Sequence, residues 1–385
     1  MGPGHGVRPT IRRRGLVSER LRVGVVFGGR SGEHEVSLMS ARSVLANLDP
    51  RKYSIVPIGI TREGLWHSGE NALQAFRDGK PETLPRVAIL GEPGRRGLFR
   101  WGEAGAFGRA AELDVIFPVT HGTYGEDGTL QGLLEMADIA YVGGGVLASS
   151  VAMDKALFKQ LMRAHNIPVV GSTLVLSTTI AADAEAAVRQ AEQAGPFPLF
   201  TKPANLGSSV GVSKCRSRSD LLEGLIDAAR YDRRVIVEQG VEAREIEVSV
   251  LGNEEPEASV PGEIVPSDEF YSYRAKYIDD ASELRIPAPI DEETAEEARR
   301  LAVAAYKATD GAGMARADFL LDRKSGRLYM NELNTLPGFT QISMYPKLWE
   351  ASGLAYPALM DRLIQLALER QAQKDRLLRT YGGAG

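Results

Sequence analysis

The chain has 385 residues, of which 43% are hydrophobic and 25% are charged, values that are ordinary for a globular protein and exclude a disordered or fibrous one. At roughly 150 residues per domain, this length predicts two or three domains. The 46 basic and 50 acidic side chains leave a net charge of −4, which argues against a nucleic-acid partner. Cys215 is the only cysteine, so we expect no disulfide within the chain, no cysteine metal site and a cytoplasmic location.

Neither the N-terminus nor the least polar stretch predicts contact with a membrane. Residues 1–20 carry five arginines but lack the apolar run of about 7–15 residues that a secretory signal requires. We therefore expect a disordered leader there, without a chemical role. Residues 139–153 form the least polar stretch, but these 15 residues are interrupted by three consecutive glycines and are too few to span a bilayer.

The first predicted domain, residues 21–143, alternates strands with helices. Residues 21–27 form a short apolar run that ends at two glycines, which predicts a buried strand entering a tight turn. A helix and two more strands are expected over residues 36–48, 53–60 and 113–119. This alternation predicts an open, mostly parallel α/β sheet. Residues 68–110 mix glycine, proline and arginine, and we interpret them as an insertion or a long connection.

The rest of the chain predicts a central domain over residues 144–240 and a C-terminal domain over residues 241–380. Helices are expected over residues 152–165, 179–194, 291–309 and 355–378. Strands are expected over residues 197–202, 235–239, 245–251, 258–264, 316–321 and 327–332. The strands between residues 235 and 264 favour an antiparallel sheet that is distinct from the first one.

A glycine-rich loop follows the first predicted strand and leads to two carboxylates, Glu33 and Glu35. The loop, Gly28-Gly29-Arg30-Ser31-Gly32, lacks the G-x-G-x-x-G spacing of dinucleotide-binding proteins, and no P-loop sequence occurs in the chain. Ligands of open α/β sheets bind at the carboxyl ends of strands, so Glu33 is a candidate substrate contact. The alternative is that these carboxylates only stabilise the N-terminus of the following helix.

A second loop, residues 205–211, is rich in glycine and serine and follows a strand that ends near Lys202. Backbone N–H groups can approach an anion where small side chains leave room, and a lysine adds positive charge. This combination predicts phosphate binding by Lys202 and the loop, with Lys155 as a second contact. A plain flexible loop and a solvent-exposed helix lysine are the alternatives.

The most specific pattern is a predicted β-hairpin near the C-terminus. A three-residue turn, Lys324-Ser325-Gly326, would pair residues whose numbers sum to 650, so that Asp318 faces Glu332. Asn334 shares the face of Glu332 if its strand continues, and Arg316 shares the face of Asp318. Carboxylate and amide oxygens favour Mg²⁺, so Asp318, Glu332 and Asn334 are candidate metal ligands. An acidic edge exposed to solvent is the alternative.

Two further segments are candidates for substrate contact. Residues 270–277 contain Lys276 and three tyrosines, among them Tyr277, and a loop of this kind can close over a ligand and exclude water. A packed surface loop is the alternative. His121 directly follows a strand and begins a glycine-bearing loop, a position that is typical of functional residues.

Taken together, these segments resemble the D-alanine–D-alanine ligase family of ATP-grasp enzymes. The resemblance extends from about residue 22 to residue 366. It rests on six strings in the family's order, FGGRSGEHEVSL, HGTYGEDG, KPANLGSSVGVSK, YSYRAKY, RADF and NELNTLPGFTQIS. The resemblance implies an ATP-grasp fold, α/β with an α+β C-terminal half, preceded by an N-terminal open parallel α/β domain.

The resemblance also implies a role for each candidate residue. The residues implied in catalysis are Glu33, Ser208, Arg316, Tyr277 and Gly338. The residues implied in ATP binding are Lys155, Lys202, Ser208, Ser209, Glu238, Glu245 and Lys276. The residues implied in substrate binding are Glu33, His121, Tyr277, Ser343 and Met344. The residues implied in holding two Mg²⁺ ions, or Mn²⁺ in their place, are Asp318, Glu332 and Asn334.

By the same resemblance, the protein would join two D-alanine molecules through an acyl phosphate for peptidoglycan precursor synthesis, releasing ADP and phosphate. It would act in the cytoplasm as a homodimer, with ATP and D-alanine as its small-molecule partners. Three alternatives remain open: a depsipeptide-forming or D-alanine–D-serine variant, another ATP-grasp enzyme, and a nucleotide-binding regulator without turnover. Tyr277 favours dipeptide synthesis over D-lactate use, since lactate-using relatives carry phenylalanine there.

Overall fold

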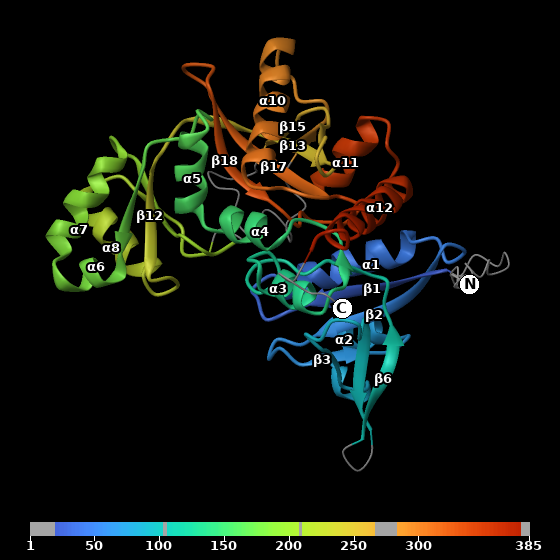
Figure 1. Cartoon of the computed structure of the whole chain (residues 1–385). Coiled ribbons are helices and arrows are strands. Elements are labelled where there is room, and N and C mark those ends of the chain that lie inside the picture. Colours follow the sequence, from blue (N-terminus) through green and yellow to red (C-terminus); the bar gives the residue numbers. More distant parts are fainter. Residues whose placement is uncertain (1–19, 103–105, 208–209, 266–282, 379–385) are drawn as a thin grey trace, which may run out of the picture.

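The structure is a computed structural model that describes residues 20–102, 106–207, 210–265 and 283–378 (Figure 1). The expected leader, apart from Arg20, lies outside the described residues. So do four residues that the resemblance placed in the site: Ser208, Ser209, Lys276 and Tyr277.

The N-terminal part of the chain forms a five-stranded sheet whose inner strands are parallel, as the sequence predicted. Its strands are, in order across the sheet, β3 (Trp66–Ser68), β2 (Tyr53–Ile60), β1 (Leu21–Gly28), β7 (Val115–Pro118) and β8 (Ala140–Tyr141). Strand β3 is antiparallel to β2 at the edge. The chain leaves β1 on one side to form β2 and returns on the other side to form β7. The carboxyl ends of β1 and β7 therefore lie at a topological switch point, where open α/β sheets bind ligands.

Residues 68–110, expected to be an insertion or a long connection, form structure of their own. They contain α2 (Ala72–Arg77), a 3₁₀ turn at Pro81–Thr83, and the strands β4 (Val87–Ile89), β5 (Gly97–Trp101) and β6 (Phe107–Glu112). The three strands make an antiparallel sheet that extends away from the body of the molecule (Figure 1). Leu98 and Ile89 of this small sheet pack with Val26 and Ile116 of the N-terminal sheet.

Helices cover both faces of the N-terminal sheet. One face packs against α1 (His34–Asn47), α2 and the last helix, α12 (Tyr356–Lys374). The other face packs against α3 (Thr129–Met136) and the small antiparallel sheet. Helix α12 lies beside α1 (Figure 1), so the end of the chain completes the core of its beginning.

The central part of the chain is a four-stranded antiparallel sheet. Its strands are, in order across the sheet, β11 (Ser213–Cys215), β10 (Leu199–Pro203), β12 (Arg234–Gln239) and β9 (Ser172–Leu176). One face packs against α7 (Ala184–Ala191), α8 (Arg218–Ala228) and α6 (Ser177–Ala182). Helix α5 (Lys155–Ala164) contacts the other face, where its Ala156 packs with Ile236 of β12. Cys215 is buried in this core, and burial raises the pKa of its thiol.

Two helices that the sequence predicted as continuous are each divided at an aspartate. In place of the helix expected over 152–165, α4 (Val146–Met153) ends before Asp154 and α5 begins after it. The carboxylate of Asp154 accepts the N–H groups of Ala156 and Leu157 and so caps α5. The helix expected over 179–194 is likewise divided into α6 and α7 by Asp183, whose side chain accepts the N–H of Ala186, and it ends in a 3₁₀ turn. Both aspartates act as N-caps, which the helical periodicity alone did not reveal.

The C-terminal part of the chain forms a larger antiparallel sheet backed by α10 (Glu292–Ala308). Its strands are, in order across the sheet, β16 (Glu283–Arg285), β15 (Gly262–Val265), β13 (Ala243–Leu251), β17 (Met314–Asp322) and β18 (Leu328–Asn334), with β14 (Glu257–Ala258) paired to β13. The strand expected over 258–264 was wrong. This segment contains the end of β14 and most of β15, and the residues between the two strands are not in a strand. Pro261 is one of them, and it lacks the N–H that a strand residue donates to its neighbour. Helix α11 (Met344–Ala351) precedes α12.

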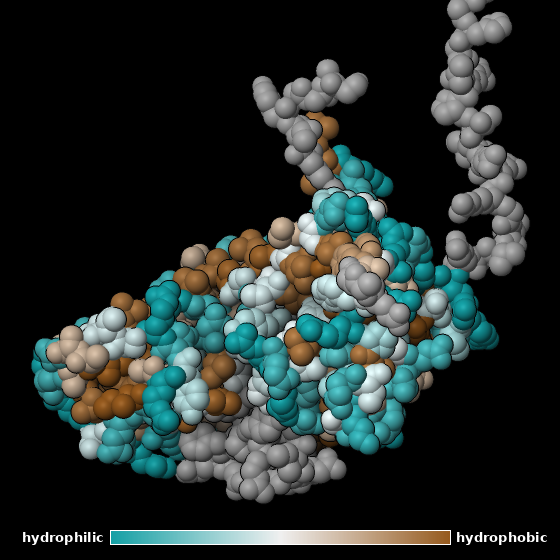
Figure 2. All heavy atoms as spheres, turned by 90° about the horizontal axis from the view of Figure 1, so that it is seen from below, coloured by the Kyte–Doolittle hydropathy of each residue, from teal (hydrophilic) through white to brown (hydrophobic). Residues whose placement is uncertain are grey.

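Within the described residues, no helix is long and apolar enough to cross a membrane. On the face shown in Figure 2, hydrophobic side chains lie in small groups that hydrophilic ones separate.

Candidate active site

A cavity of about 1690 Å³ lies between the three parts of the chain, and residues from each of them line it. Every candidate residue within the described part of the chain lines this one cavity. These residues are Glu33, His121, Lys155, Lys202, Glu238, Glu245, Arg316, Asp318, Glu332, Asn334, Gly338, Ser343 and Met344. The structure therefore brings together residues that are up to about 300 positions apart in the sequence.

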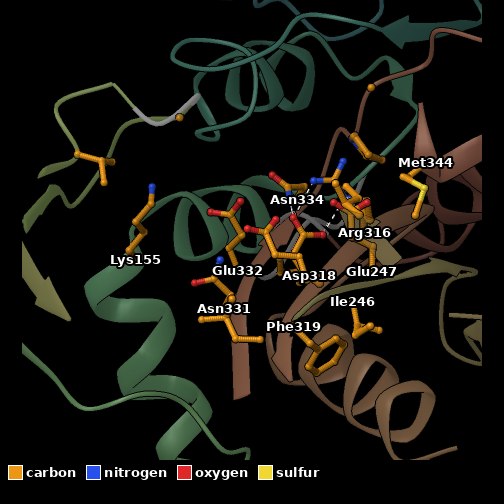
Figure 3. A pocket seen from close by; sticks show the side chains of 18 of the residues that line it. Lys155, Ile246, Glu247, Arg316, Asp318, Phe319, Asn331, Glu332, Asn334 and Met344 are labelled. Carbon is orange, nitrogen blue, oxygen red and sulfur yellow. Dashed lines mark hydrogen bonds and ion pairs between the residues drawn. The ribbon is translucent and has the colours of Figure 1, made fainter. Parts of the chain in front are cut away.

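The floor of the cavity is the polar face of β13, β17 and β18. Asp318 of β17 lies opposite Glu332 of β18, as predicted, and opposite Glu247 of β13 on its other side. In the next row, Arg316 lies opposite Asn334. Side chains alternate between the faces of a strand, so Phe319 and Ile246 point to the other side of the sheet (Figure 3).

The predicted turn of this hairpin was wrong, although the predicted pair was right. Near the turn, Leu321 pairs with Leu328, and Asp322 N–H donates to Arg327 O, so the turn has four residues rather than three. A β-bulge beyond Met330 then adds one residue, Asn331, to β18 and shifts the register. The bulge restores the pairing that the three-residue turn would have produced.

Arg316 holds the acidic side chains of the floor together. Its Nε and Nη2 each donate to one oxygen of Asp318 at 2.7 Å, and its Nε lies 3.0 Å from Oε2 of Glu247. Asn334 Nδ2 donates to Asp318 Oδ2 at 2.9 Å. The cation expected beside the carboxylates is thus in place, and it offsets their mutual repulsion.

The donor atoms at this floor fit a hard cation. Two carboxylates and an amide oxygen are oxygen donors, which Mg²⁺ and Mn²⁺ prefer. Within the described residues there is no group of three or more His, Cys, Asp or Glu side chains that could hold a metal by itself.

Lys202 reaches the cavity from β10 and is held by Glu238 of β12. The two residues are diagonal neighbours on one face of the antiparallel pair, and Lys202 Nζ donates to Glu238 Oε2 at 2.7 Å. Burial disfavours the charged carboxylate, but Lys159 and Lys202 outweigh this effect and lower the pKa of Glu238 to about 2. Burial also disfavours the charged form of Lys202, but the attraction of the Glu238 carboxylate outweighs this effect and raises the pKa of Lys202.

Lys155 is the first residue of α5 and lies across the cavity from the acidic floor (Figure 3). Its Nζ donates to the carbonyl of Leu206 at 2.6 Å, and its N–H donates to Ala204 O at 2.9 Å. These bonds tie the helix to the glycine-rich loop that begins after β10. The structure thus places both predicted phosphate-binding lysines and the start of this loop at one end of the cavity.

Glu33 lies where the loops after β1, β7 and β10 meet. Two glycines make room for its carboxylate, since a Cβ on Gly122 or Gly207 would lie 2.6 Å or 3.1 Å from Glu33 Oε2. Ser31 Oγ accepts the N–H of Glu33 and donates to His121 O, which joins the loops after β1 and β7. Glu33 is the N-cap residue of α1, and its side chain makes no capping bond.

His121 is buried and connects these loops to the segment after β18. Its Nδ1 lies 3.2 Å from Leu336 O and its Nε2 lies 2.9 Å from Ser40 Oγ, which also accepts the N–H of Phe339. Burial lowers the pKa of His121, which favours a neutral ring that donates from Nδ1 and accepts at Nε2. Leu336 and Phe339 flank Gly338, so this network fixes the backbone on both sides of that residue.

Gly338, Ser343 and Met344 form the wall beyond this network. A Cβ on Gly338 would lie 2.9 Å from Ser343 Oγ, so the close approach of the two requires a glycine. Ser343 Oγ accepts the N–H of Thr340, and Ser343 is the N-cap position of α11, whose first residue is Met344. The N-terminus of this helix faces the cavity, an arrangement that suits a carboxylate.

Sequence reasoning missed three charged residues of the site. Glu247 could have been found, because Glu245 and Glu247 alternate with apolar residues and so share a face of β13. Lys159 lies on the apolar stripe of α5 formed by Ala156 and Met162, which is an unusual place for a lysine. Glu126 carried no signal beyond its place in the loop that begins at His121.

Glu126 accepts the N–H of Gly122 at 2.5 Å and lines the cavity. Burial and the nearby carboxylate of Glu33 raise its pKa well above the usual value for a glutamate. The site therefore holds one carboxyl group that resists ionisation.

Comparison with known proteins decides the family. The N-terminal and C-terminal models of D-alanine–D-alanine ligase match residues 22–144 and 161–365. The chain belongs to the D-alanine–D-alanine ligase family. A D-alanine–D-alanine ligase of Thermoanaerobacter sp. (strain X514) is 51% identical over 93% of this chain and 99% of its own length. One from Natranaerobius thermophilus is 46% identical over 93% of this chain and 98% of its own length.

Solved structures of the family have the same fold. The D-alanine–D-alanine ligase of Coxiella burnetii superimposes with a TM-score of 0.79 at 34% identity, covering 94% of this chain and 97% of that one. The D-Ala:D-Ser ligase VanG of Enterococcus faecalis superimposes with a TM-score of 0.81 at 34% identity, covering 91% of this chain and 100% of that one. The predicted ATP-grasp fold is therefore confirmed.

Proposed function

We propose that this chain joins two D-alanine molecules into D-alanyl-D-alanine, converting one ATP into ADP and phosphate. The observation that supports this most strongly is the set of residues that line the cavity between the three parts of the chain. Two lysines are offered to phosphates, the floor offers oxygen ligands and an arginine, and the carboxylate of Glu33 is offered to an ammonium group. Family membership supports the same reaction.

ATP would lie between the central and C-terminal sheets, with Lys155 and Lys202 at its phosphates. Glu245 would meet the ribose. Glu238 would meet the adenine side through its backbone, since its carboxylate is bound to two lysines. Asp318, Glu332 and Asn334 would hold two Mg²⁺ ions against the phosphates. When bound, these ions neutralise charge on the transferred phosphoryl group.

The first step is attack by a carboxylate oxygen of the first D-alanine on the γ-phosphorus. The P–O bond to ADP breaks, and the product is an acyl phosphate. Glu33 would bind the ammonium group of this substrate and so hold its carboxylate towards the floor. Lys202 and Arg316 add positive charge where the phosphoryl group passes.

The second step is attack by the amine of the second D-alanine on the acyl carbon, with phosphate as the leaving group. Arg316 and the N–H of Gly338 would stabilise the oxyanion of the tetrahedral intermediate. Ser343 and the N-terminus of α11 at Met344 would receive the carboxylate of the second substrate. His121 lies next to this subsite, where it fixes the backbone around Gly338.

Several finer assignments belong to the same proposal. Ser208 and Tyr277 would complete the surroundings of the first ammonium, and Ser209 and Lys276 would contact ATP phosphates. We also propose the domain division at residues 21–143, 144–240 and 241–380, a homodimer, and a cytoplasmic location. The buried single cysteine and the need for ATP support that location.

The test is to incubate the full chain with ATP, MgCl₂ and D-alanine and to detect the products by mass spectrometry. We expect D-alanyl-D-alanine and phosphate in equal amounts. Parallel reactions that add D-serine or D-lactate test the second candidate, a mixed ligase, which the similarity to VanG favours. A preference for either mixed product would overturn the choice of D-alanine at the second subsite, and ATP binding without any product would indicate a regulator.

A further inference from the structure

Lys159 is a buried lysine that the proposed reaction leaves without a role. It lies on α5, one turn after Lys155, and its side chain is 1% exposed. Burial lowers the pKa of Lys159, because removing the charged ammonium group from water costs free energy. Buried charges of this kind are retained only where they are paired and hydrogen-bonded.

The ammonium group of Lys159 joins the two halves of the nucleotide end of the cavity. Its Nζ lies 3.2 Å from Glu238 Oε1, and it donates to the carbonyl of Asn331 at 3.2 Å. The other oxygen of Glu238 accepts the bond from Lys202 at 2.7 Å. A continuous path of polar contacts therefore runs from β18 through Lys159 and Glu238 to Lys202.

The contact between Lys159 and Asn331 lies at the bulge of β18. Asn331 is the extra residue of the bulge, and it immediately precedes Glu332. A bulge takes its extra residue out of the regular ladder, which makes a separate partner for its backbone valuable. Lys159 supplies a donor to this carbonyl.

We propose that Lys159 is a positioning residue that sets Lys202 and Glu332 in register with each other. Through Glu238 it fixes the lysine that meets the phosphates, and through Asn331 O it fixes the bulge that presents the metal ligand. One buried charge thus aligns the nucleotide side of the site with its metal side. This inference rests on the proposed function for the roles of Lys202 and Glu332.

The experiment compares Lys159→Met, which keeps the volume and removes the charge, with Lys159→Arg, which keeps the charge. Lys307→Met, an exposed lysine in the last turn of α10, is the matched control. Calorimetric titration with ADP in the presence of MgCl₂ measures nucleotide affinity without turnover. Steady-state kinetics then give kcat, the KM values for ATP and D-alanine, and the Mg²⁺ concentration for half-maximal rate.

For Lys159→Met we expect ADP affinity to fall about 10- to 100-fold, as for other residues that orient ligand-holding side chains, and the KM for ATP and the Mg²⁺ requirement to rise in parallel. The KM for D-alanine should stay within about twofold, since Glu33 and Ser343 lie elsewhere in the cavity. Lys159→Arg should recover most of the loss. Lys307→Met should behave as the wild type.

Normal ADP affinity and Mg²⁺ requirement in folded Lys159→Met would overturn the proposal. So would a lower apparent kcat and a lower ADP stoichiometry with unchanged KM values and ADP affinity, which is the mark of a smaller folded fraction. If Lys159→Met does not fold, Lys159→Gln, which keeps a donor for Asn331 O, must still show weakened ADP binding. If the wild type binds ADP but forms no dipeptide, the proposed function fails while the ADP titration still tests Lys159.

Discussion

Glu332 lies directly opposite Asp318, although Met330, two positions before it on the same strand, is fully buried in the core. Regular alternation would place Met330 and Glu332 on the same face of the sheet. The bulge at Asn331 changes the phase of the strand between them. The bulge is therefore what allows one strand to contribute both to the core and to the acidic floor of the cavity.

We expect Glu332→Ala to lower kcat at least about 100-fold, because it removes a ligand whose ion stabilises the charge of the transferred phosphoryl group. The measurement is phosphate release with saturating ATP and D-alanine. Glu297→Ala, on the exposed side of α10, is the control for loss of a glutamate. Near-normal turnover in Glu332→Ala would show that the metal assignment is wrong.

Arg316→Lys tests the arginine of the floor while keeping its charge. Lysine cannot reproduce the two-atom bond to Asp318 together with the contact to Glu247. We expect kcat to fall roughly 100-fold with little change in the KM for ATP, since the lost donor acts in the transition state. A decrease smaller than about fivefold would contradict a role in stabilising charge.

Ser40→Ala tests whether the network around Gly338 matters for the reaction. The substitution removes the partner of His121 Nε2 and the acceptor of the Phe339 N–H. A shift of the oxyanion donor by about 1 Å costs up to roughly 100-fold in rate, so we expect kcat to fall about 10- to 100-fold. ADP affinity should be unchanged, because these residues lie away from the lysines. Weakened ADP binding with normal kcat would refute this role.

Glu126→Gln tests the carboxyl group whose pKa is raised by burial and by Glu33. Because the folded-state pKa is raised, the folded wild type binds more protons than the unfolded chain, and its stability is lost as pH rises above about 4.5. Glutamine has no such titration. We therefore expect Glu126→Gln to gain stability relative to the wild type between pH 5 and pH 8 in urea unfolding. A constant difference across this range would contradict the assignment.

The N-terminal sheet and the hairpin were predictable because each depends on local pattern. Apolar runs that end in glycine located β1, and the tyrosine-to-isoleucine run at residues 53–60 gave the bounds of β2. Asp318 and Glu332 were paired correctly because two differences cancel. The real turn is one residue longer than the predicted one, and the extra residue of the bulge in β18 shifts the register back by one. The pattern contained the pairing but not the bulge that produces it.

Other features depend on contacts that no local pattern contains. Nothing in the sequence of α12 shows that it packs on the N-terminal sheet, where Leu363 joins the same buried cluster as Val25. Glu126 is an ordinary loop glutamate until the fold buries it beside Glu33. Lys159 differs in this respect, because its position on an apolar helix face was visible in the sequence.

The most direct test of the account follows the oxygen of the first substrate. D-alanine labelled with ¹⁸O in both carboxylate oxygens is incubated with the full chain, ATP and MgCl₂, and the released phosphate is analysed by mass spectrometry. Attack by the carboxylate on the γ-phosphorus predicts one ¹⁸O atom in each phosphate for each dipeptide formed. Dipeptide formation with unlabelled phosphate, or with the label in AMP, would contradict an acyl phosphate made at this site.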